Sequence, residues 1–327
     1  MARAKIKETE YIFASARVHA AMGRLIGADK LEAAISAKDA SEAEALLKEL
    51  DGDDSGDKFS AALASAYNFI ESVTPEESVL EYFRNIYDCN NIKAALKCHF
   101  RAIEPQEMLF SFGKVSLEDI KKMPSTLDFS ALPENMREGA REAYDAFVKT
   151  KNPQLIDIIL DKACFADMLS AAKKSGDDFL LELAKTKIDL TNITMSTRSV
   201  RMGGGYNEIE VLSSSLIDGG YIDKEKMLEA AKVGEDDIAD LLNGTPYASL
   251  GGLIGERASL SRIECECDNI YMKLVRRTKY VPFGASVLCA FLIATEYQLK
   301  NLRMILAGKK AGLSADTIRE RVRLSYV

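Results

Sequence analysis

The chain has 327 residues, of which 47% are hydrophobic and 28% charged, so it is long enough for two or three domains and too apolar for a disordered protein. Its 50 acidic residues outnumber its 43 basic ones, and the net charge of −7 disfavours a surface built to bind nucleic acid. With two histidines the chain has little material for histidine catalysis or a zinc site, and we expect no cofactor.

Helical periodicity dominates the sequence. From Tyr11 to Leu25, apolar residues recur every three or four positions, which is typical of a helix that packs one face against a core. Polar capping residues, prolines and acids predict further helix starts at Thr74-Pro75-Glu76-Glu77, Ser116, Asn152-Pro153, Asp223 and Ser314. No segment has the pattern of a β-hairpin. The predicted fold class is therefore all-α.

The most apolar segment, Ala285 to Ala294, has about half of the roughly 20 residues that a membrane-spanning helix needs. It predicts a buried helix instead. The first ten residues lack the apolar stretch of a secretory signal, so we expect a cytoplasmic protein.

The chain also resembles itself at intervals of about one third of its length. Asn91, Asn192 and Asn301 lie 101 and 109 residues apart, and each is followed by an aliphatic residue and later by a new helix start. This spacing predicts three similar helical units, 1–115, 116–222 and 223–327. Within them, we expect these apolar residues to form core: Ile92, Leu96, Ile193, Leu302, Ile305 and Leu306.

Two DDxxD strings offer an enzymatic alternative. They are Asp53-Asp54-Ser-Gly-Asp57 and Asp236-Asp237-Ile-Ala-Asp240. They resemble the aspartates with which all-α prenyl-diphosphate synthases hold magnesium against a diphosphate. The match degrades because no Arg-Arg pair follows the first string, and because glycines disfavour a mid-helix position there. Acids in the first turn of a helix, stabilised by its dipole, account better for Asp236 and Asp237.

Several segments together carry a family resemblance. They are the opening Tyr11-Ile-Phe-Ala-Ser-Ala-Arg17-Val18, Tyr82 to Asp88 running into Asn91-Ile92-Lys93, Asp189 to Asn192, and Glu296 to Arg303 with Arg319 to Arg323 after it. In their order, threefold spacing and total length they resemble the C subunits of the archaeal and bacterial A/V-type (vacuolar-type) rotary ATPases, the counterparts of the d subunit of eukaryotic vacuolar ATPases.

That resemblance implies a funnel of three similar helical domains around a pseudo-threefold axis, without catalytic residues. It implies a monomeric subunit, one copy per complex, at the cytoplasmic face of the membrane. There it would join the central shaft, of D- and F-type subunits, to the membrane rotor ring for proton or sodium transport. A helical adaptor without this role is the non-enzymatic alternative.

The resemblance also suggests roles for two residue sets. The three asparagines either line the funnel or hydrogen-bond a neighbouring helix end. The last 58 residues carry eleven bases against three acids, whereas residues 29–57 carry ten acids against three lysines. This asymmetry makes Arg319, Arg321 and Arg323 candidates for docking between the soluble and membrane sectors.

Overall fold

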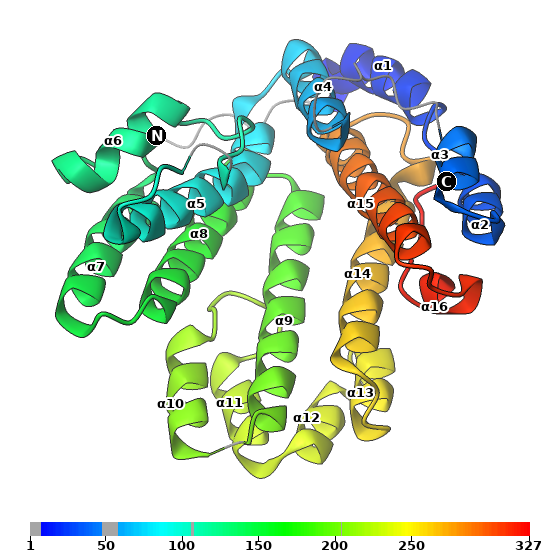
Figure 1. Cartoon of the computed structure of the whole chain (residues 1–327). Coiled ribbons are helices and arrows are strands. Elements are labelled where there is room, and N and C mark those ends of the chain that lie inside the picture. The colour runs from blue at the N-terminus through cyan, green and yellow to red at the C-terminus, as the bar shows by residue number, and fades with distance from the viewer. Residues whose placement is uncertain (1–7, 48–57, 106–107, 204) are drawn as a thin grey trace. The chain divides into compact units, whose positions relative to one another are not determined.

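Helices make up the regular secondary structure of the part of the chain that can be described. The computed structural model describes residues 8–47, 58–105, 108–203 and 205–327. Within these ranges the elements are α-helices and short 3-10 helices, and no strand is present (Figure 1). The prediction of an all-α fold is confirmed for these residues.

The first of two compact units, called unit 1, comprises residues 76–234. Its helices are α5 (Glu77–Arg101), α6 (Leu117–Thr126), α7 (Glu134–Thr150), α8 (Gln154–Ser175), α9 (Asp178–Arg201), α10 (Tyr206–Ser215) and α11 (Lys224–Val233). Helix α8 packs against both α5 and α7. At Gly139 of α7, an added Cβ would lie 2.8 Å from the Cβ of Ala163 on α8, so the close approach of these helices requires glycine.

The second unit, unit 2, combines residues 6–75 with residues 235–327. From the N-terminal part come η1 (Glu8–Tyr11), α1 (Ile12–Met22), α2 (Ala28–Ser36), α3 (Ala40–Leu46) and α4 (Lys58–Val73). From the C-terminal part come α12 (Glu235–Leu242), α13 (Ala248–Gly255), α14 (Leu260–Arg276), η3 (Arg277–Tyr280), α15 (Ala285–Lys310) and α16 (Ala315–Arg319). The division into three domains, 1–115, 116–222 and 223–327, stays a prediction.

Helix α15 is the centre of unit 2. It contacts α1, α2, α3 and α4 as well as α14 and α16. Its first ten residues, the apolar run noted in the sequence, are buried almost throughout, which confirms the predicted buried helix. None of the described helices is both long enough and apolar enough to span a membrane. Of the predicted core residues, five are fully buried, and Leu306 is partly buried against the core of unit 2 that contains Leu302 and Ile305.

Three predicted N-caps are confirmed by side-chain oxygens that accept hydrogen bonds from the backbone. Ser116 accepts from the N–H of Asp119 at 3.1 Å, and Ser314 and Asp223 make equivalent bonds to the first turns of α16 and α11. The start expected at Thr74 is displaced, because the N–H of Thr74 still bonds to the preceding helix. Helix α5 begins at Glu77, with an extended Glu76 before it.

Candidate functional site: amide clamps and the basic C-terminal segment

The three asparagines occupy equivalent positions on the long helices α5, α9 and α15. Each is buried, and its side-chain amide exchanges two hydrogen bonds with the backbone of one residue in a segment that returns along the helix. Nδ2 donates to the carbonyl oxygen, and Oδ1 accepts from the N–H of the same residue. The partner residues are Phe110 for Asn91, Ile217 for Asn192 and Arg323 for Asn301, at 2.8–2.9 Å.

We call each such pair an amide clamp. A carboxamide has the shape of a peptide group, so it completes the hydrogen bonding of a backbone residue that lies outside the helices. Breaking the pair inside the protein would leave buried backbone groups unsatisfied, at about 1–3 kcal/mol per group. The asparagines thus hydrogen-bond the backbone of returning segments, and not a helix end as the second of the two interpretations expects. That they line a funnel stays a prediction.

In unit 1 an aspartate three residues before the asparagine adds a second set of bonds. Asp88 accepts from the N–H groups of Lys114 and Val115 at 3.0 and 3.1 Å. Asp189 accepts from Tyr221 and Ile222, both at 3.0 Å. These backbone groups directly precede the capping residues of α6 and α11, so each aspartate fixes where the next helix begins.

Two glycines make room for these carboxylates. A Cβ at Gly113 would lie 2.1 Å from Oδ1 of Asp88, and a Cβ at Gly220 would lie 2.1 Å from Oδ1 of Asp189. Any other residue would overlap the aspartate. Both aspartates belong to the segments that carry the family resemblance, but the sequence assigned them no role, and it gave no sign of the two glycines.

Burial raises the pKa of Asp88 to about 6, although the two backbone N–H groups oppose this shift. The carboxylate form is therefore held at neutral pH in a site that partly disfavours it. Because the group acts as a hydrogen-bond acceptor between backbone segments, this perturbation has a structural explanation and does not point to acid–base catalysis.

The candidate docking arginines have different surroundings. Arg323 is 9% exposed, and its Nε lies 3.0 Å from Oδ2 of the buried Asp268 on α14. Arg319 makes a bidentate ion pair with Glu32 on α2, which lowers the pKa of Glu32 through hydrogen bonding. Arg321 is exposed to solvent. The three arginines are therefore close in sequence, but the structure does not place them in one solvent-facing cluster.

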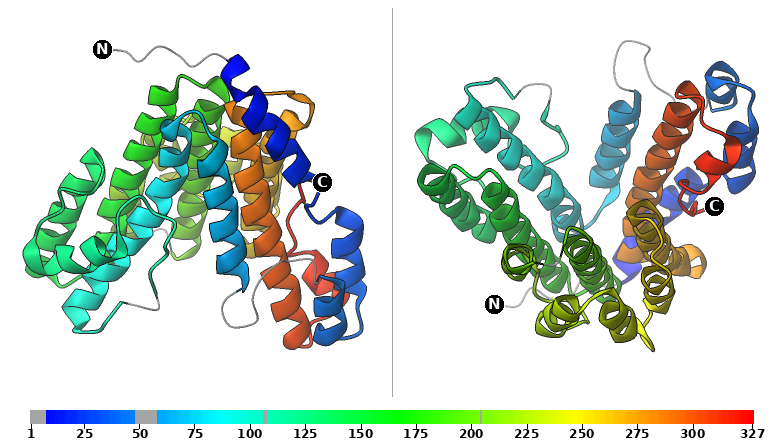
Figure 2. Two further views of the ribbon diagram at one scale, coloured as in Figure 1. Left: turned by 90° about the horizontal axis from the view of Figure 1, so that it is seen from above. Right: turned by 60° about the horizontal axis from the view of Figure 1, so that its bottom comes forward.

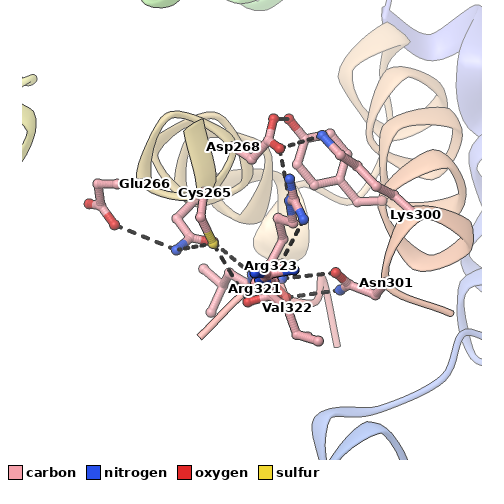
Figure 3. Close-up of polar contacts among 11 residues, drawn as sticks. Cys265, Glu266, Asp268, Lys300, Asn301, Arg321, Val322 and Arg323 are labelled. Atoms are coloured by element: carbon pink, nitrogen blue, oxygen red, sulfur yellow. Dashed lines mark hydrogen bonds and ion pairs between the residues drawn. The ribbon is translucent and has the colours of Figure 1, made fainter. Parts of the chain in front are cut away.

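Asp268 is the centre of a polar cluster that ties α14, α15 and the C-terminal segment together (Figure 3). Its Oδ1 accepts from the hydroxyl of Tyr297 at 3.0 Å, and its Oδ2 pairs with both Lys300 and Arg323. Burial, with the neighbouring Asp268 charge, holds the pKa of Tyr297 well above its ordinary value. The cluster was not predicted, because its members lie on three separate elements.

Similarity to known proteins extends over nearly the whole chain. Residues 14–321 match the sequence model of the family described as ATP synthase (C/AC39) subunit. The chain belongs to this family. The resemblance noted in the sequence is thereby confirmed.

Relatives of the C/AC39 family support the match over most of the chain. The C subunit of the V-type sodium ATPase of Enterococcus hirae is 24% identical over 262 residues, covering 80% of this chain and 79% of the relative. The C subunit of the A-type ATP synthase of Methanobrevibacter smithii is 23% identical over 338 residues, covering 95% and 87%. That of Methanocaldococcus jannaschii is 21% identical over 276 residues, covering 79% and 68%.

The enzymatic alternative gains no support from the residues that can be described. The first DDxxD string, Asp53 to Asp57, lies outside them. Asp236 and Asp237 stand in the first turn of α12, as the dipole explanation expects, and Asp236 pairs with Arg257 at 3.0 Å. Throughout the described ranges, no three His, Cys, Asp or Glu side chains are grouped so that they could hold a metal ion.

Much of the basic excess in the last part of this C/AC39 chain is engaged within unit 2. Besides Arg319 and Arg323, Lys273 pairs with Glu266, and the Lys309 ammonium donates to the carbonyl oxygen of Ala37. On η3, burial and the nearby Arg276 charge lower the pKa of Lys279, whose ammonium lies 5.4 Å from the ring centroid of Tyr326.

Proposed function

We propose that the chain is the non-catalytic central-stalk subunit of an A/V-type rotary ATPase or ATP synthase. It couples the rotating shaft, built of D- and F-type subunits, to the membrane rotor ring that carries protons or sodium ions. It acts as a monomer, one copy per complex, held at the cytoplasmic face of the membrane by protein contacts. The family match over residues 14–321 is the observation that carries this proposal.

The repeated amide clamps support the associated architecture of three similar domains around a pseudo-threefold axis. The same asparagine geometry recurs on α5, α9 and α15, in the order and at the spacing that the sequence repeat predicts. A funnel built from three such units would receive the end of the shaft and rest on the ring.

A subunit that transmits torque needs stiffness more than it needs reactive groups. Closely packed helices resist compression, since protein interiors contain few voids. The clamps add to this stiffness, because each fixes a returning segment against a long helix through buried, fully paired polar groups. Rotation would then move the subunit as one body without shifting its loops.

For docking, the surroundings of the three arginines single out Arg321. Arg323 and Arg319 are held by Asp268 and Glu32, while the Arg321 side chain faces solvent. We propose that Arg321, with the exposed side chains of Arg277 and Lys279 on η3, contributes to the contact between the soluble and membrane sectors. Exposed charges contribute about 0–1 kcal/mol each and are screened by salt, so several must act together.

Affinity purification through a tag on this chain, from detergent-solubilised membranes, tests the assignment. Co-purification of the rotor ring with the D- and F-type shaft subunits is expected. Deleting the chain should abolish ATP-driven ion transport in inverted vesicles while the detached soluble sector still hydrolyses ATP. Recovery of the chain alone, with transport intact in the deletion strain, would favour a helical adaptor.

An assay of the purified chain with magnesium and isoprenyl diphosphates addresses the enzymatic alternative. No turnover is expected. Turnover that disappears in Asp236→Ala and persists in the surface control Asp128→Ala would assign a synthase activity and contradict the coupling role.

A further inference from the structure

In unit 1 an aspartate and an asparagine three residues apart together hold one returning segment, and we call this arrangement a double clamp. We infer that Gln298 and Asn301 form a third double clamp, which holds two segments from opposite parts of the sequence. This third copy opens before the two copies of unit 1. Gln298 stands three residues before Asn301, as Asp88 stands before Asn91. Its Oε1 accepts a hydrogen bond from the N–H of Ile26 at 2.6 Å. This inference does not depend on the proposed function.

The position of Ile26 matches that of its counterparts in unit 1. In each copy, the residue whose N–H is accepted comes directly before a helix N-cap. The pairs are Val115 and Ser116 before α6, Ile222 and Asp223 before α11, and Ile26 and Gly27 before α2. The glutamine thus fixes the start of α2 as the aspartates fix the starts of α6 and α11.

The helices that follow share a second feature. Each N-cap is preceded by an aliphatic residue and followed, four positions later, by a buried apolar one, which is the pattern of a hydrophobic staple. The buried residues are Ile120, Met227 and Leu31, all at most 4% exposed. Local sequence and tertiary hydrogen bonding therefore agree on the same register in all three copies.

The third copy differs in connectivity. In unit 1 the two bonded parts lie on one segment: Val115 comes five positions after Phe110, and Ile222 comes five positions after Ile217. In unit 2, Arg323 follows α16 whereas Ile26 follows α1, so no short stretch of chain joins them. Figures 1 and 2 show the C-terminal end beside the N-terminal helices of the same unit. Either segment can leave α15 without the other being pulled along.

The third copy also differs in chemistry. An ionised aspartate accepts two backbone N–H groups in each copy of unit 1, whereas Gln298 is neutral and makes one such bond, with Ile26. Hydrogen bonds to a charged acceptor are roughly twice as strong as those between neutral groups. Arg24 stands where the other copies have their glycine, so this copy lacks the glycine that lets a carboxylate approach the backbone closely.

Two further contacts hold the same N-terminal segment to the C-terminal part of the sequence. Arg319 on α16 pairs with Glu32 on α2, and Lys309 on α15 donates to the carbonyl oxygen of Ala37. The ion pair is exposed, so salt screens it. The polar contacts that hold α2 to the C-terminal part of the sequence are therefore weaker and more salt-sensitive than the clamps of unit 1.

Amide hydrogen exchange of the full chain under native conditions, resolved to single residues, tests the inference. The N–H of Ile26 should exchange about fivefold faster or more than those of Val115 and Ile222, after correction for intrinsic rates. Raising the salt concentration should widen this difference. Equal protection at the three positions, or greater protection at Ile26, would overturn the order of opening.

Substitutions test whether the two segments open separately. Gln298→Met keeps length but removes the acceptor, and should accelerate exchange at Ile26 while leaving Arg323 nearly unchanged, because no short stretch of chain joins the two segments; the matched control Gln154→Met, at an exposed position, should change neither. Gln298→Glu supplies a charged acceptor and should slow exchange at Ile26 severalfold, so it decides the matter if the first variant misfolds. Equal acceleration at Ile26 and Arg323 in Gln298→Met, or faster exchange at Ile26 in Gln298→Glu, would contradict the inference.

Discussion

Units 1 and 2 fix a returning segment against a long helix with the same buried asparagine, but they use carboxylates differently. In unit 1 Asp88 and Asp189 bind backbone N–H groups beside a glycine. In unit 2 a glutamine takes that place, and the carboxylate of Asp268, from another helix, binds the side chain of Arg323. The comparison shows that backbone geometry is repeated while the chemistry that stabilises it is not.

The largest expected effect comes from breaking the carboxylate contact of unit 2. Arg323→Glu would place two negative charges together where Asp268 is 12% exposed, and should destabilise the protein by about 3–5 kcal/mol, the usual range for breaking a buried pair. Urea unfolding measures this loss.

The matched control is Arg321→Glu, the same charge change at an exposed position. It should alter the free energy of unfolding by no more than about 0.5 kcal/mol. If both variants are equally stable, Asp268 does not hold the C-terminal segment, and Arg323 is again a candidate docking residue.

Replacing a glycine that lies against a buried aspartate of unit 1 gives the next largest effect. Gly113→Ala forces a methyl group into the space of the Asp88 carboxylate, so either the aspartate or the loop must move, at about 3 kcal/mol. Gly252→Ala in α13 is the control, because nothing lies within 4 Å of the added Cβ; it should stabilise the protein by about 0.5–1 kcal/mol. A Gly113→Ala variant as stable as the control would show that the close approach of Asp88 to residue 113 does not require glycine.

How far the sequence predicts this fold depends on the range of the interactions. The caps at Ser116, Asp223 and Ser314 were predictable, because a cap is a contact between residues three apart. The asparagines were found by their repetition. Asp268 and Gln298 could not be assigned partners, since those lie 55 and 272 residues away and no local pattern records such contacts. For the same reason the sequence did not indicate that α1–α4 pack with the C-terminal helices.

The clamps themselves should differ in strength with burial. The hydrogen bonds of Asn192 are buried, whereas those of Asn91 and Asn301 are partly buried. Asn192→Ala should therefore cost about 2–3 kcal/mol, and each of the other two alanine variants about 1 kcal/mol less, because water can reach the freed backbone groups. Thermal and urea unfolding of the three variants gives the order, and a smaller loss at Asn192 would contradict it.

A pH dependence specific to unit 1 follows from the burial of Asp88. Burial raises the pKa of Asp88 from 3.8 to about 6, so between pH 6 and pH 4 the folded protein binds a proton that the unfolded chain does not. Stability from this group therefore increases as the pH falls, by about 2 kcal/mol between pH 7 and pH 4, and levels off below the unfolded pKa. In Asp88→Asn this contribution is absent. The difference in free energy of unfolding between the native chain and Asp88→Asn, measured by urea titration across this range, should grow toward low pH. A difference that shrinks as the pH falls would mean that the carboxylate, stabilised by the N–H groups of Lys114 and Val115, has a lowered pKa.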